Sequence, residues 1–184
     1  MKQLLFFIVL SVLGCKMGNA QSLYKMPVKP ISTKIINKEI LYNEVLTQPQ
    51  YDYHVVTIYT NYCGGTPFFF QRLKRFDSAG YKRVHWVCCS SADLKDSLET
   101  VQVLKKYGVY VDTVYLIDNK KYKEKRSDDR YKGFVFRKHI CLPCKKDIIG
   151  VPYSIVFDNK KKIVAYGYIH DEEIRAAISK PIKP

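Results

Sequence analysis

The sequence predicts a single α/β domain with a central mixed β-sheet that is flanked by helices. Short apolar runs rich in β-branched residues alternate with stretches whose apolar residues recur at helical spacing. Near the C-terminus, two further strand-like runs lie close together and are separated by a short polar turn. An order of strand, helix, strand, helix, strand, hairpin and helix implies a mixed sheet covered by helices. A chain of 184 residues suffices for one domain with a hydrophobic core.

The first part of the domain is expected to hold three strands and two helices. The run YHVVTIY at 53–59 is apolar and β-branched, which is typical of a strand buried on both faces. A helix at 66–78 has three apolar residues at helical spacing and Pro67 in its first turn, with Gly80 ending it. The other elements expected here are strands at 83–89 and 112–118, and a helix at 91–107 capped by Ser91 and stopped by Gly108.

The second part begins with a highly charged stretch. Asn119–Lys132 holds ten charged residues in fourteen, so we expect an exposed loop. A short strand is predicted at Gly133–Arg137 and a short helix at Leu142–Ile149. The two strands of a hairpin are expected at 153–158 and 162–169, and a final amphipathic helix is expected at 171–179.

The N-terminal segment has the features of an export signal. Residues 1–20 contain a lysine, an apolar run of about ten residues that is too short to span a bilayer, and then small residues. Two processing sites compete. Cleavage after Ala20 would give a soluble chain, whereas removal of residues 1–14 at a loose bacterial lipobox would leave Cys15 to carry a lipid. Either route takes the protein out of the cytoplasm, to the periplasm or cell envelope of a bacterium.

Residues 21–50 carry three prolines and many polar residues. We interpret them as a tether leading into a short strand or helix, with the folded domain at 51–184.

The chain is strongly basic. It holds 31 Lys and Arg against 17 Asp and Glu, for a net charge of +14. Such charge can attract phosphates, but the basic residues are spread along the chain and export separates the protein from most nucleic acid. We therefore expect no nucleic-acid partner, and membrane contact only through a lipid anchor at Cys15.

One cysteine lies between the first predicted strand and helix, in the stretch TNYCGGTP. The thiol of Cys63 would face the positive end of the helix dipole and free backbone N–H groups, which stabilise a thiolate. A thiolate is the species that attacks a disulfide sulfur. Gly64 and Gly65 would leave the sulfur sterically open. The stretch therefore predicts a nucleophile that forms mixed disulfides.

Together with the later stretch GVPYSIVFDNKKKIVAYG, this segment resembles the thioredoxin fold, and with the export signal it resembles the extracytoplasmic TlpA-type thiol–disulfide oxidoreductases. The resemblance covers roughly residues 50–178. It implies that Cys63 matches the exposed nucleophile, that Pro152 is the cis-proline beside it, and that Val151 offers backbone hydrogen bonds to an extended substrate. Thr66 stands where the family has its second, resolving cysteine, so the CxxC motif is altered to Cys-Gly-Gly-Thr. The motif alone therefore cannot release a mixed disulfide.

A second pair of cysteines forms the CxxC stretch Cys141-Leu142-Pro143-Cys144, which ends eight residues before Pro152. The pair could resolve a mixed disulfide on Cys63, form a dithiol of its own, or form a structural disulfide of the kind common in exported proteins. A metal site using His139, Cys141 and Cys144 lacks an evident fourth ligand.

The remaining cysteines and histidines have structural interpretations. Cys88 and Cys89 are adjacent on a predicted strand, point to opposite faces, and are expected to fill the core. His54, His85 and His170 show no spacing that suggests a partner. Cleavage after residue 20 would leave five cysteines, an odd number, so at least one thiol stays free or pairs outside the chain.

Three functions follow from these observations. The first is thiol–disulfide exchange through Cys63, with Cys141 or Cys144 as candidate resolving thiols and with protein thiols or disulfides, or an external low-molecular-weight thiol, as partners. The second is a non-catalytic thioredoxin-like module that binds a partner beside Pro152. The third is a metal carrier that uses Cys63 with the Cys141 and Cys144 pair. The sequence indicates no cofactor.

Overall fold

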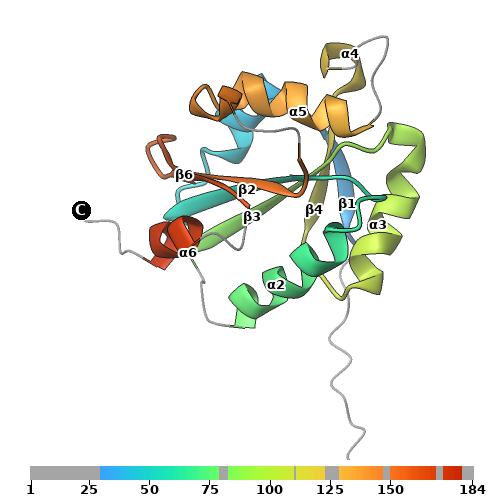
Figure 1. Ribbon diagram of the computed structural model, residues 1–184, viewed down its shortest axis with the longest axis horizontal. Coiled ribbons are helices and arrows are strands. Elements are labelled where there is room, and N and C mark those ends of the chain that lie inside the picture. Colours follow the sequence, from blue (N-terminus) through green and yellow to red (C-terminus); the bar gives the residue numbers. More distant parts are fainter. Residues whose placement is uncertain are drawn as a thin grey trace, which may run out of the picture.

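One six-stranded mixed sheet lies at the centre of the computed structural model of the protein (Figure 1). The structure describes residues 30–78, 83–109, 111–122, 129–146, 150–168 and 172–179. The predicted export signal with Cys15 lies outside these residues, as do Gly80 and His170. The strands are β1 Ser32–Ile36, β2 Tyr53–Tyr59, β3 Val84–Ser90, β4 Thr113–Ile117, β5 Tyr153–Asp158 and β6 Ile163–Gly167.

The strand order is β1-β4-β3-β2-β5-β6. Strands β1, β4, β3 and β2 run parallel to one another. Strand β5 pairs antiparallel with both β2 and β6. The mixed sheet predicted from the sequence is thereby confirmed. Because β2, β3 and β4 are parallel, the loops after them leave from the same edge of the sheet. The Cys63 segment follows β2 and lies at that edge.

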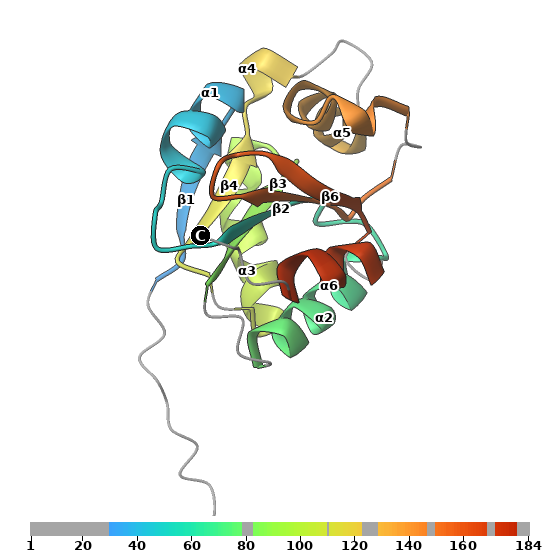
Figure 2. The ribbon, with the colours of Figure 1, turned by 90° about the vertical axis from the view of Figure 1, so that its left-hand side faces the viewer.

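Helices cover both faces of the sheet. In Figures 1 and 2, α1, α4 and α5 lie on one face, and α2, α3 and α6 lie on the other. Each face has its own apolar cluster, because strand side chains alternate between the two sides. The helices are α1 Lys38–Ile40, α2 Thr66–Ser78, α3 Ser97–Lys106, α4 Asn119–Tyr122, α5 Asp129–Ile140 and α6 Glu172–Ser179.

The central strands are buried as their sequences predict. Every residue of β2 is buried, in keeping with an apolar β-branched run covered on both faces. Cys88 and Cys89 belong to the clusters on opposite faces and are 1% and 0% exposed, which confirms the expectation that they fill the core. Gly108 follows α3 with a φ of 61°, a backbone conformation that favours glycine, so the predicted helix stop is also confirmed.

Where the structure describes it, the charged stretch after β4 is not the exposed loop that was predicted; residues 123–128 lie outside the described part. Its first four residues form α4, and Asp129–Ile140 forms α5, so the short strand expected at Gly133–Arg137 is wrong as well. Residues 132, 133, 136, 137 and 140 make up the buried stripe of α5 at helical spacing. Two positions of that stripe hold cations, Lys132 and Arg137, which are each 1% exposed. Because these cations and Gly133 interrupt the stripe, the spacing of apolar residues alone does not reveal the helix.

Two shorter predictions also need correction. The helix expected at 91–107 begins with a 3₁₀ turn at Leu94–Asp96 and becomes α-helical only at Ser97–Lys106. Ser91 is not its cap, because both its backbone N–H and its hydroxyl donate to the Tyr59 carbonyl. The helix expected at 142–149 is a 3₁₀ turn over Pro143–Lys146 in the part that is described.

The segment before β2 contributes both a strand and helical turns. Strand β1 pairs in parallel with β4 and forms one edge of the sheet. The π-helical turn Leu41–Val45 places its two apolar ends in the same cluster as Phe136 and Ile140 of α5. Within the described residues, no helix is long and apolar enough to cross a membrane.

Candidate functional site

The Cys63 thiol lies at the start of α2, in the turn that follows β2. The amide of Thr66 donates to the Cys63 carbonyl over 2.9 Å, which closes the first turn. Cys63 is half-buried, and its Sγ donates to the carbonyl oxygen of Val151 over 3.1 Å. The structure therefore brings together two residues that are 88 positions apart in the chain, and whose segments the resemblance to the thioredoxin fold had paired.

The Val151–Pro152 peptide bond is cis, as the resemblance to the thioredoxin fold implies. Gly65 fits closely against this bond. A Cβ at Gly65 would lie 3.2 Å from Pro152 Cδ, 3.7 Å from the Cys63 Sγ and 3.8 Å from the Val151 carbonyl oxygen. A Cβ at Gly64, in contrast, would meet nothing within 4 Å. Of the two glycines, only Gly65 is required by close packing at the thiol.

Thr66, which the resemblance aligns with the resolving cysteine of the thioredoxin fold, has a fully buried side chain. It is 0% exposed, and its hydroxyl donates to the Thr60 carbonyl over 2.7 Å. The hydroxyl thereby satisfies a buried carbonyl where the chain leaves β2 and enters the Cys63 turn. Thr66 holds this turn and cannot supply a sulfur.

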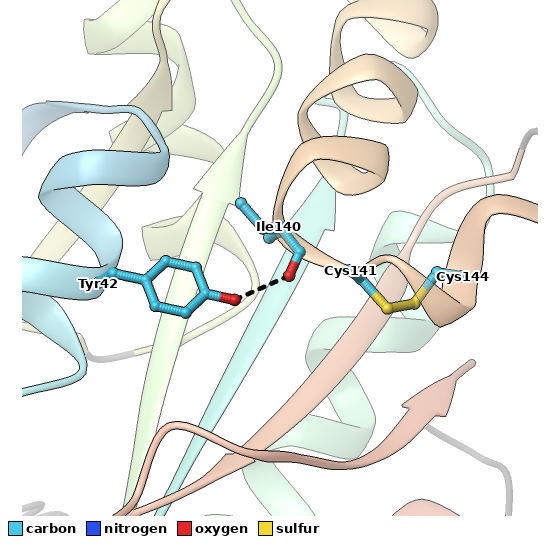
Figure 3. Close-up of a disulfide and its surroundings, with 4 residues drawn as sticks. All are labelled: Tyr42, Ile140, Cys141 and Cys144. Carbon is cyan, nitrogen blue, oxygen red and sulfur yellow. Dashed lines mark hydrogen bonds between the residues drawn. A yellow bond between two sulfur atoms is a disulfide. The ribbon is translucent and has the colours of Figure 1, made fainter.

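Cys141 and Cys144 form a disulfide with each other at the end of α5 (Figure 3). Both residues are 0% exposed. The hydroxyl of Tyr42 donates to the Ile140 carbonyl over 3.0 Å, just before the bridge. The structure thus supports the disulfide interpretation of this CxxC stretch and does not bond either sulfur to Cys63. Within the described ranges, no group of three or more His, Cys, Asp or Glu is placed to hold a metal ion.

Cys63 is the only half-buried free cysteine in the part of the chain that the structure describes. The other two free cysteines, Cys88 and Cys89, lie in the core, where burial raises the pKa of Cys88 to about 12 and also raises the pKa of Cys89. A thiol with so high a pKa is protonated at neutral pH and is a poor nucleophile.

A cavity of about 240 Å³ is lined in part by Gly65 and Val151, the two residues that lie against the Cys63 thiol. Val151 and Pro152, which the sequence predicts to contact a substrate, form part of its wall. The complete lining consists of Gly65, Phe68, Phe69, Arg72, Val151, Pro152 and Tyr168.

Sequence analysis missed three members of this lining. Phe68 lies outside the apolar stripe of its helix and is 66% exposed, while Phe69 is 2% exposed. Arg72 lies one turn further along α2, and Tyr168 follows β6. A signal for Phe68 and Arg72 was present, because residues four apart on a helix share a face. No local pattern pointed to Tyr168.

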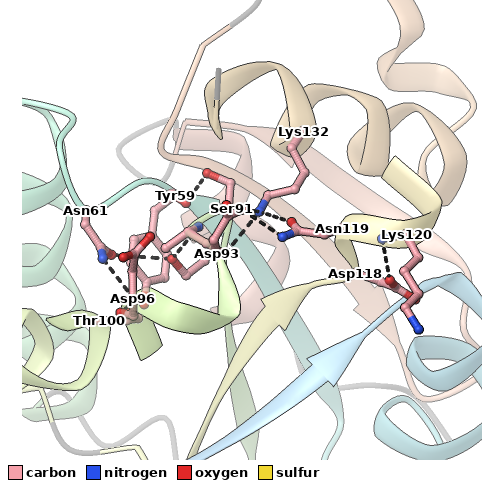
Figure 4. Close-up of polar contacts among 12 residues, drawn as sticks. Tyr59, Asn61, Ser91, Asp93, Asp96, Thr100, Asp118, Asn119, Lys120 and Lys132 are labelled. Atoms are coloured by element: carbon pink, nitrogen blue, oxygen red, sulfur yellow. Dashed lines mark hydrogen bonds and ion pairs between the residues drawn. The ribbon is translucent and has the colours of Figure 1, made fainter. Parts of the chain in front are cut away.

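A buried polar cluster lies near the same edge of the sheet (Figure 4). The Lys132 ammonium donates to the Ala92 carbonyl over 3.1 Å, to Asp93 Oδ1 over 3.0 Å and to the side-chain oxygen of Asn119. The Asn119 amide in turn donates to Asp93 over 2.8 Å. The cluster ties α5 to the ends of β3 and β4.

This anchoring positions α5 against Val151. A Cβ at Gly133, the residue after Lys132, would lie 2.9 Å from Ile58 Cγ2 and 3.9 Å from Val151 Cγ1. The absence of a side chain at Gly133 therefore lets the helix approach both the central strand and the residue that accepts the Cys63 hydrogen bond. The cluster acts on the site through packing only.

Two histidines that the sequence left without partners face each other across β2 and β3. The Nδ1 atoms of His54 and His85 are 3.1 Å apart, and Tyr51 stacks on His85 with ring centroids 4.6 Å apart. Burial lowers the pKa of each histidine to about 4; the charge of His85 adds to the effect on His54. Both imidazoles are therefore neutral at pH 7, with one Nδ1 donating to the other.

Comparison with known proteins identifies no family. No family model and no curated protein matches this chain. Similar solved structures include the thioredoxin domain of a thiol-disulfide oxidoreductase from Bacteroides vulgatus, at 15% identity and a TM-score of 0.47, covering 71% of this chain and 79% of that one. A thiol:disulfide interchange protein from Bacteroides sp. shows 16% identity and a TM-score of 0.48, covering 73% and 75% of the two chains.

A secreted disulfide oxidoreductase from Mycobacterium tuberculosis is similar at 10% identity and a TM-score of 0.45, covering 71% of this chain and 83% of that one. With TM-scores below 0.5, these similarities carry no argument about the activity of this chain. The functional conclusion has to come from the site itself.

Proposed function

We propose that this protein is an exported thiol–disulfide exchange protein that acts through the single thiol of Cys63. The observation that carries the proposal is the contact between the half-buried Cys63 Sγ and the carbonyl of Val151, a residue that also lines a cavity. A substrate sulfur that enters this cavity meets an accessible thiol at the first turn of a helix, where backbone N–H groups favour the thiolate.

The reaction is a disulfide exchange. The Cys63 thiolate attacks one sulfur of a substrate disulfide, a new bond forms between Cys63 and that sulfur, and the other sulfur leaves as a thiolate. No electrons are gained or lost overall, because one disulfide replaces another. The Val151 carbonyl accepts the Cys63 S–H hydrogen bond in the resting protein, and loss of the proton frees that carbonyl for a backbone N–H of an extended substrate.

An external thiol completes the cycle. Thr66 supplies no sulfur, and the sulfurs of Cys141 and Cys144 are bonded to each other and buried. A protein thiol or a low-molecular-weight thiol therefore attacks the mixed disulfide, takes over the substrate sulfur, and releases the Cys63 thiolate. This scheme uses Cys63 as the only redox-active residue and assigns the Cys141–Cys144 bridge a structural role.

Restoring a second sulfur tests the scheme directly. In the variant Thr66→Cys, the new thiol lies one helical turn from Cys63, within reach of a disulfide. We expect a Cys63 mixed disulfide with glutathione to resolve without added thiol in this variant, and to persist in the wild type. Intact-mass spectrometry over time measures both. The matched control Thr66→Val removes the same hydrogen bond to Thr60 without adding a sulfur, and should resolve no faster than the wild type.

Two results would contradict the proposed function. One is that Cys63 in the folded wild-type protein forms no mixed disulfide with glutathione disulfide. The other is that the wild type resolves its mixed disulfide as fast as Thr66→Cys does, which would point to a second sulfur in the native chain.

A non-catalytic binding module is the second candidate. It is favoured by the burial of Thr66 in the place of a resolving cysteine, next to an open cavity. The variant Cys63→Ala distinguishes the two functions. A binding module keeps its affinity for a partner when the sulfur is lost, whereas disulfide exchange stops.

A further inference from the structure

The cavity beside Cys63 has a composition that points to a particular class of substrate. Resting on the exchange function proposed above, we propose that it recognises a peptide segment of a partner protein in which a large apolar side chain and a carboxylate lie next to the cysteine that Cys63 attacks. The partner is thus a protein whose disulfide is flanked by an acidic residue and by a large aromatic or aliphatic residue. A small thiol compound would use only part of this surface.

The lining places an apolar wall and one cation side by side. Phe68 and Arg72 are four residues apart on α2, so their side chains lie on the same face of the helix. Phe69, Pro152 and Tyr168 complete the apolar part of the cavity. Among the described residues that line it, Arg72 is the one charged group. An arginine beside an apolar wall binds a carboxylate well, because its planar fork matches the two carboxylate oxygens.

The cavity adjoins the Cys63 turn through two of its lining residues, Gly65 and Val151. A Cβ on its lining residue Gly65 would be 3.7 Å from the Cys63 Sγ, so a side chain in the cavity belongs to a residue very close to the substrate cysteine. The volume of about 240 Å³ is below the range of about 300–1,000 Å³ that is usual for drug-sized ligands. One large side chain is therefore a better match for this cavity than a cofactor or a whole small molecule.

Exposed apolar residues on both sides of Cys63 extend the contact surface. Tyr62 is 68% exposed and directly precedes the thiol, and its hydroxyl donates to Glu99 Oε2 over 2.8 Å. Leu98, the residue before Glu99 on α3, is 69% exposed. With Phe68 on the other side, the thiol is flanked by large apolar side chains, which mark protein contact surfaces more often than small-ligand sites.

Charge complementarity supports an acidic partner. The chain has a net charge of +14, and an acidic segment gains from this field before it reaches Arg72. Glu99 is bound to the Tyr62 hydroxyl and is not among the residues that line the cavity. An arriving carboxylate therefore meets Arg72 as the charged group of the cavity wall.

The experiment measures how fast Cys63 attacks activated peptide disulfides. Four probes carry 2-nitro-5-thiobenzoate as the leaving thiol, so that each attack releases one coloured thiolate. Three are peptides of equal length whose cysteine is flanked by Phe and Glu, by Phe and Gln, or by Ala and Glu. The fourth is the mixed disulfide with 2-hydroxyethanethiol, in which the transferred group is small and uncharged, and it reports the intrinsic reactivity of Cys63. The benzoate carboxylate of the leaving thiol is common to all four probes and cancels in the comparison. The proteins are the wild type, Arg72→Gln, Phe68→Ala and the control Arg83→Gln.

The control variant Arg83→Gln changes a different arginine, which lies at the other end of the sheet. Arg83 precedes β3, forms an exposed ion pair with Asp52, and its side chain is 68% exposed. Because Cys63 follows β2, which is parallel to β3, Arg83 lies far from the cavity. Arg83→Gln alters the net charge by the same amount as Arg72→Gln, and so separates the cavity contact from the general field.

We expect the wild type to prefer the Phe and Glu peptide over the Phe and Gln peptide by about two- to fivefold, the range of an exposed ion pair. Arg72→Gln should abolish that preference, and Arg83→Gln should keep it. Phe68→Ala should reduce the preference for Phe over Ala by about threefold or more, since it removes part of the apolar wall. Arg83→Gln should react with the hydroxyethyl probe at the wild-type rate. For Arg72→Gln and Phe68→Ala, each peptide rate is divided by the same protein's rate with the hydroxyethyl probe, so that a change in the intrinsic reactivity of Cys63 does not enter the preference.

The outcomes separate this inference from the proposed function. If Cys63 reacts with the hydroxyethyl probe but shows no preference among the peptides, or a preference that Arg72→Gln leaves intact, the substrate inference is wrong and exchange through Cys63 stands. If Cys63 of the folded protein reacts with no probe at all, the exchange function is wrong, and the substrate inference that rests on it is wrong too.

Discussion

At the scale of single residues, the two glycines of the Cys63 turn have different roles. Gly65 packs against Pro152 and the Cys63 sulfur, whereas a Cβ at Gly64 would enter open space. We expect Gly65→Ala to displace Pro152 or the turn, to slow attack by Cys63 several-fold, and to destabilise the fold by about 1 kcal/mol. Gly64→Ala is the matched control and should leave both quantities nearly unchanged. Rates of thiolate release and urea unfolding measure them; equal effects of the two variants would refute this assignment.

The buried histidine pair predicts how stability depends on pH. The folded pKa of about 4 for His54 and His85 lies below the ordinary value near 6.5, so the unfolded chain takes up protons first as the pH falls. Their contribution to stability is complete above about pH 6.5 and is lost progressively between about pH 6.5 and 4. We expect the unfolding free energy at about pH 5 to be lower than at pH 8 by about 2 kcal/mol for each histidine.

Urea unfolding at these two pH values tests this expectation. The variant His85→Gln removes one titrating ring and keeps a polar partner for His54, so the loss on acidification should fall to about half. If the wild type is equally stable at both pH values, the pair is not neutral in the fold and the interpretation fails.

At the scale of elements, α5 depends on Lys132 more than on any exposed charge in its surroundings. The Lys132 ammonium is buried and satisfies Asp93, Asn119 and a backbone carbonyl. Loss of the ammonium leaves these acceptors without their donor, and breaking a buried pair is costly. We expect Lys132→Met to lower the unfolding free energy by about 2–4 kcal/mol.

The control for this prediction lies on α4. Lys120 is exposed, and its backbone N–H, not its ammonium, binds Asp118. Lys120→Met removes the same charge and should change stability by less than about 0.5 kcal/mol. Similar effects of the two substitutions would show that the buried cluster contributes nothing specific.

Element positions follow from local sequence to different degrees. The bounds of β2, α2 and β5 agree with those predicted, because an uninterrupted apolar run or a regular apolar stripe marks each of them. Helix α5 was missed because its buried stripe includes Lys132 and Arg137. Arg137 lies with its guanidinium 4.1 Å from the centroid of the Tyr153 ring, a contact with another element that no local pattern contains.

At the scale of the whole molecule, the fold sorts the cysteines by accessibility. We expect iodoacetamide to label Cys63 in the native protein and to leave Cys88 and Cys89 unlabelled until urea unfolds the chain, because both are buried and their pKa values are raised. Cys141 and Cys144 should need reduction as well as unfolding. Peptide mass spectrometry measures each site, and native labelling of Cys88 at the rate of Cys63 would contradict the fold-based assignment.

By itself, the sequence predicted the class of fold, which the structure confirms, and it singled out Cys63 as the candidate nucleophile. Strand and helix periodicities, turn glycines and the position of Cys63 before a helix are properties of neighbouring residues, so they can be read without the tertiary structure. The resemblance to the thioredoxin fold also implied that Pro152 would lie beside the thiol.

Only the tertiary structure decided what surrounds Cys63. The Cys63–Val151 contact spans 88 positions and the His54–His85 contact spans 31, and the same long-range packing joins Tyr168 to α2 in one cavity. It also decided that Cys141 and Cys144 bond to each other, among the alternatives that their spacing left open. The physical reason is that burial and contact between distant residues depend on how the elements pack, and a local pattern does not encode that packing.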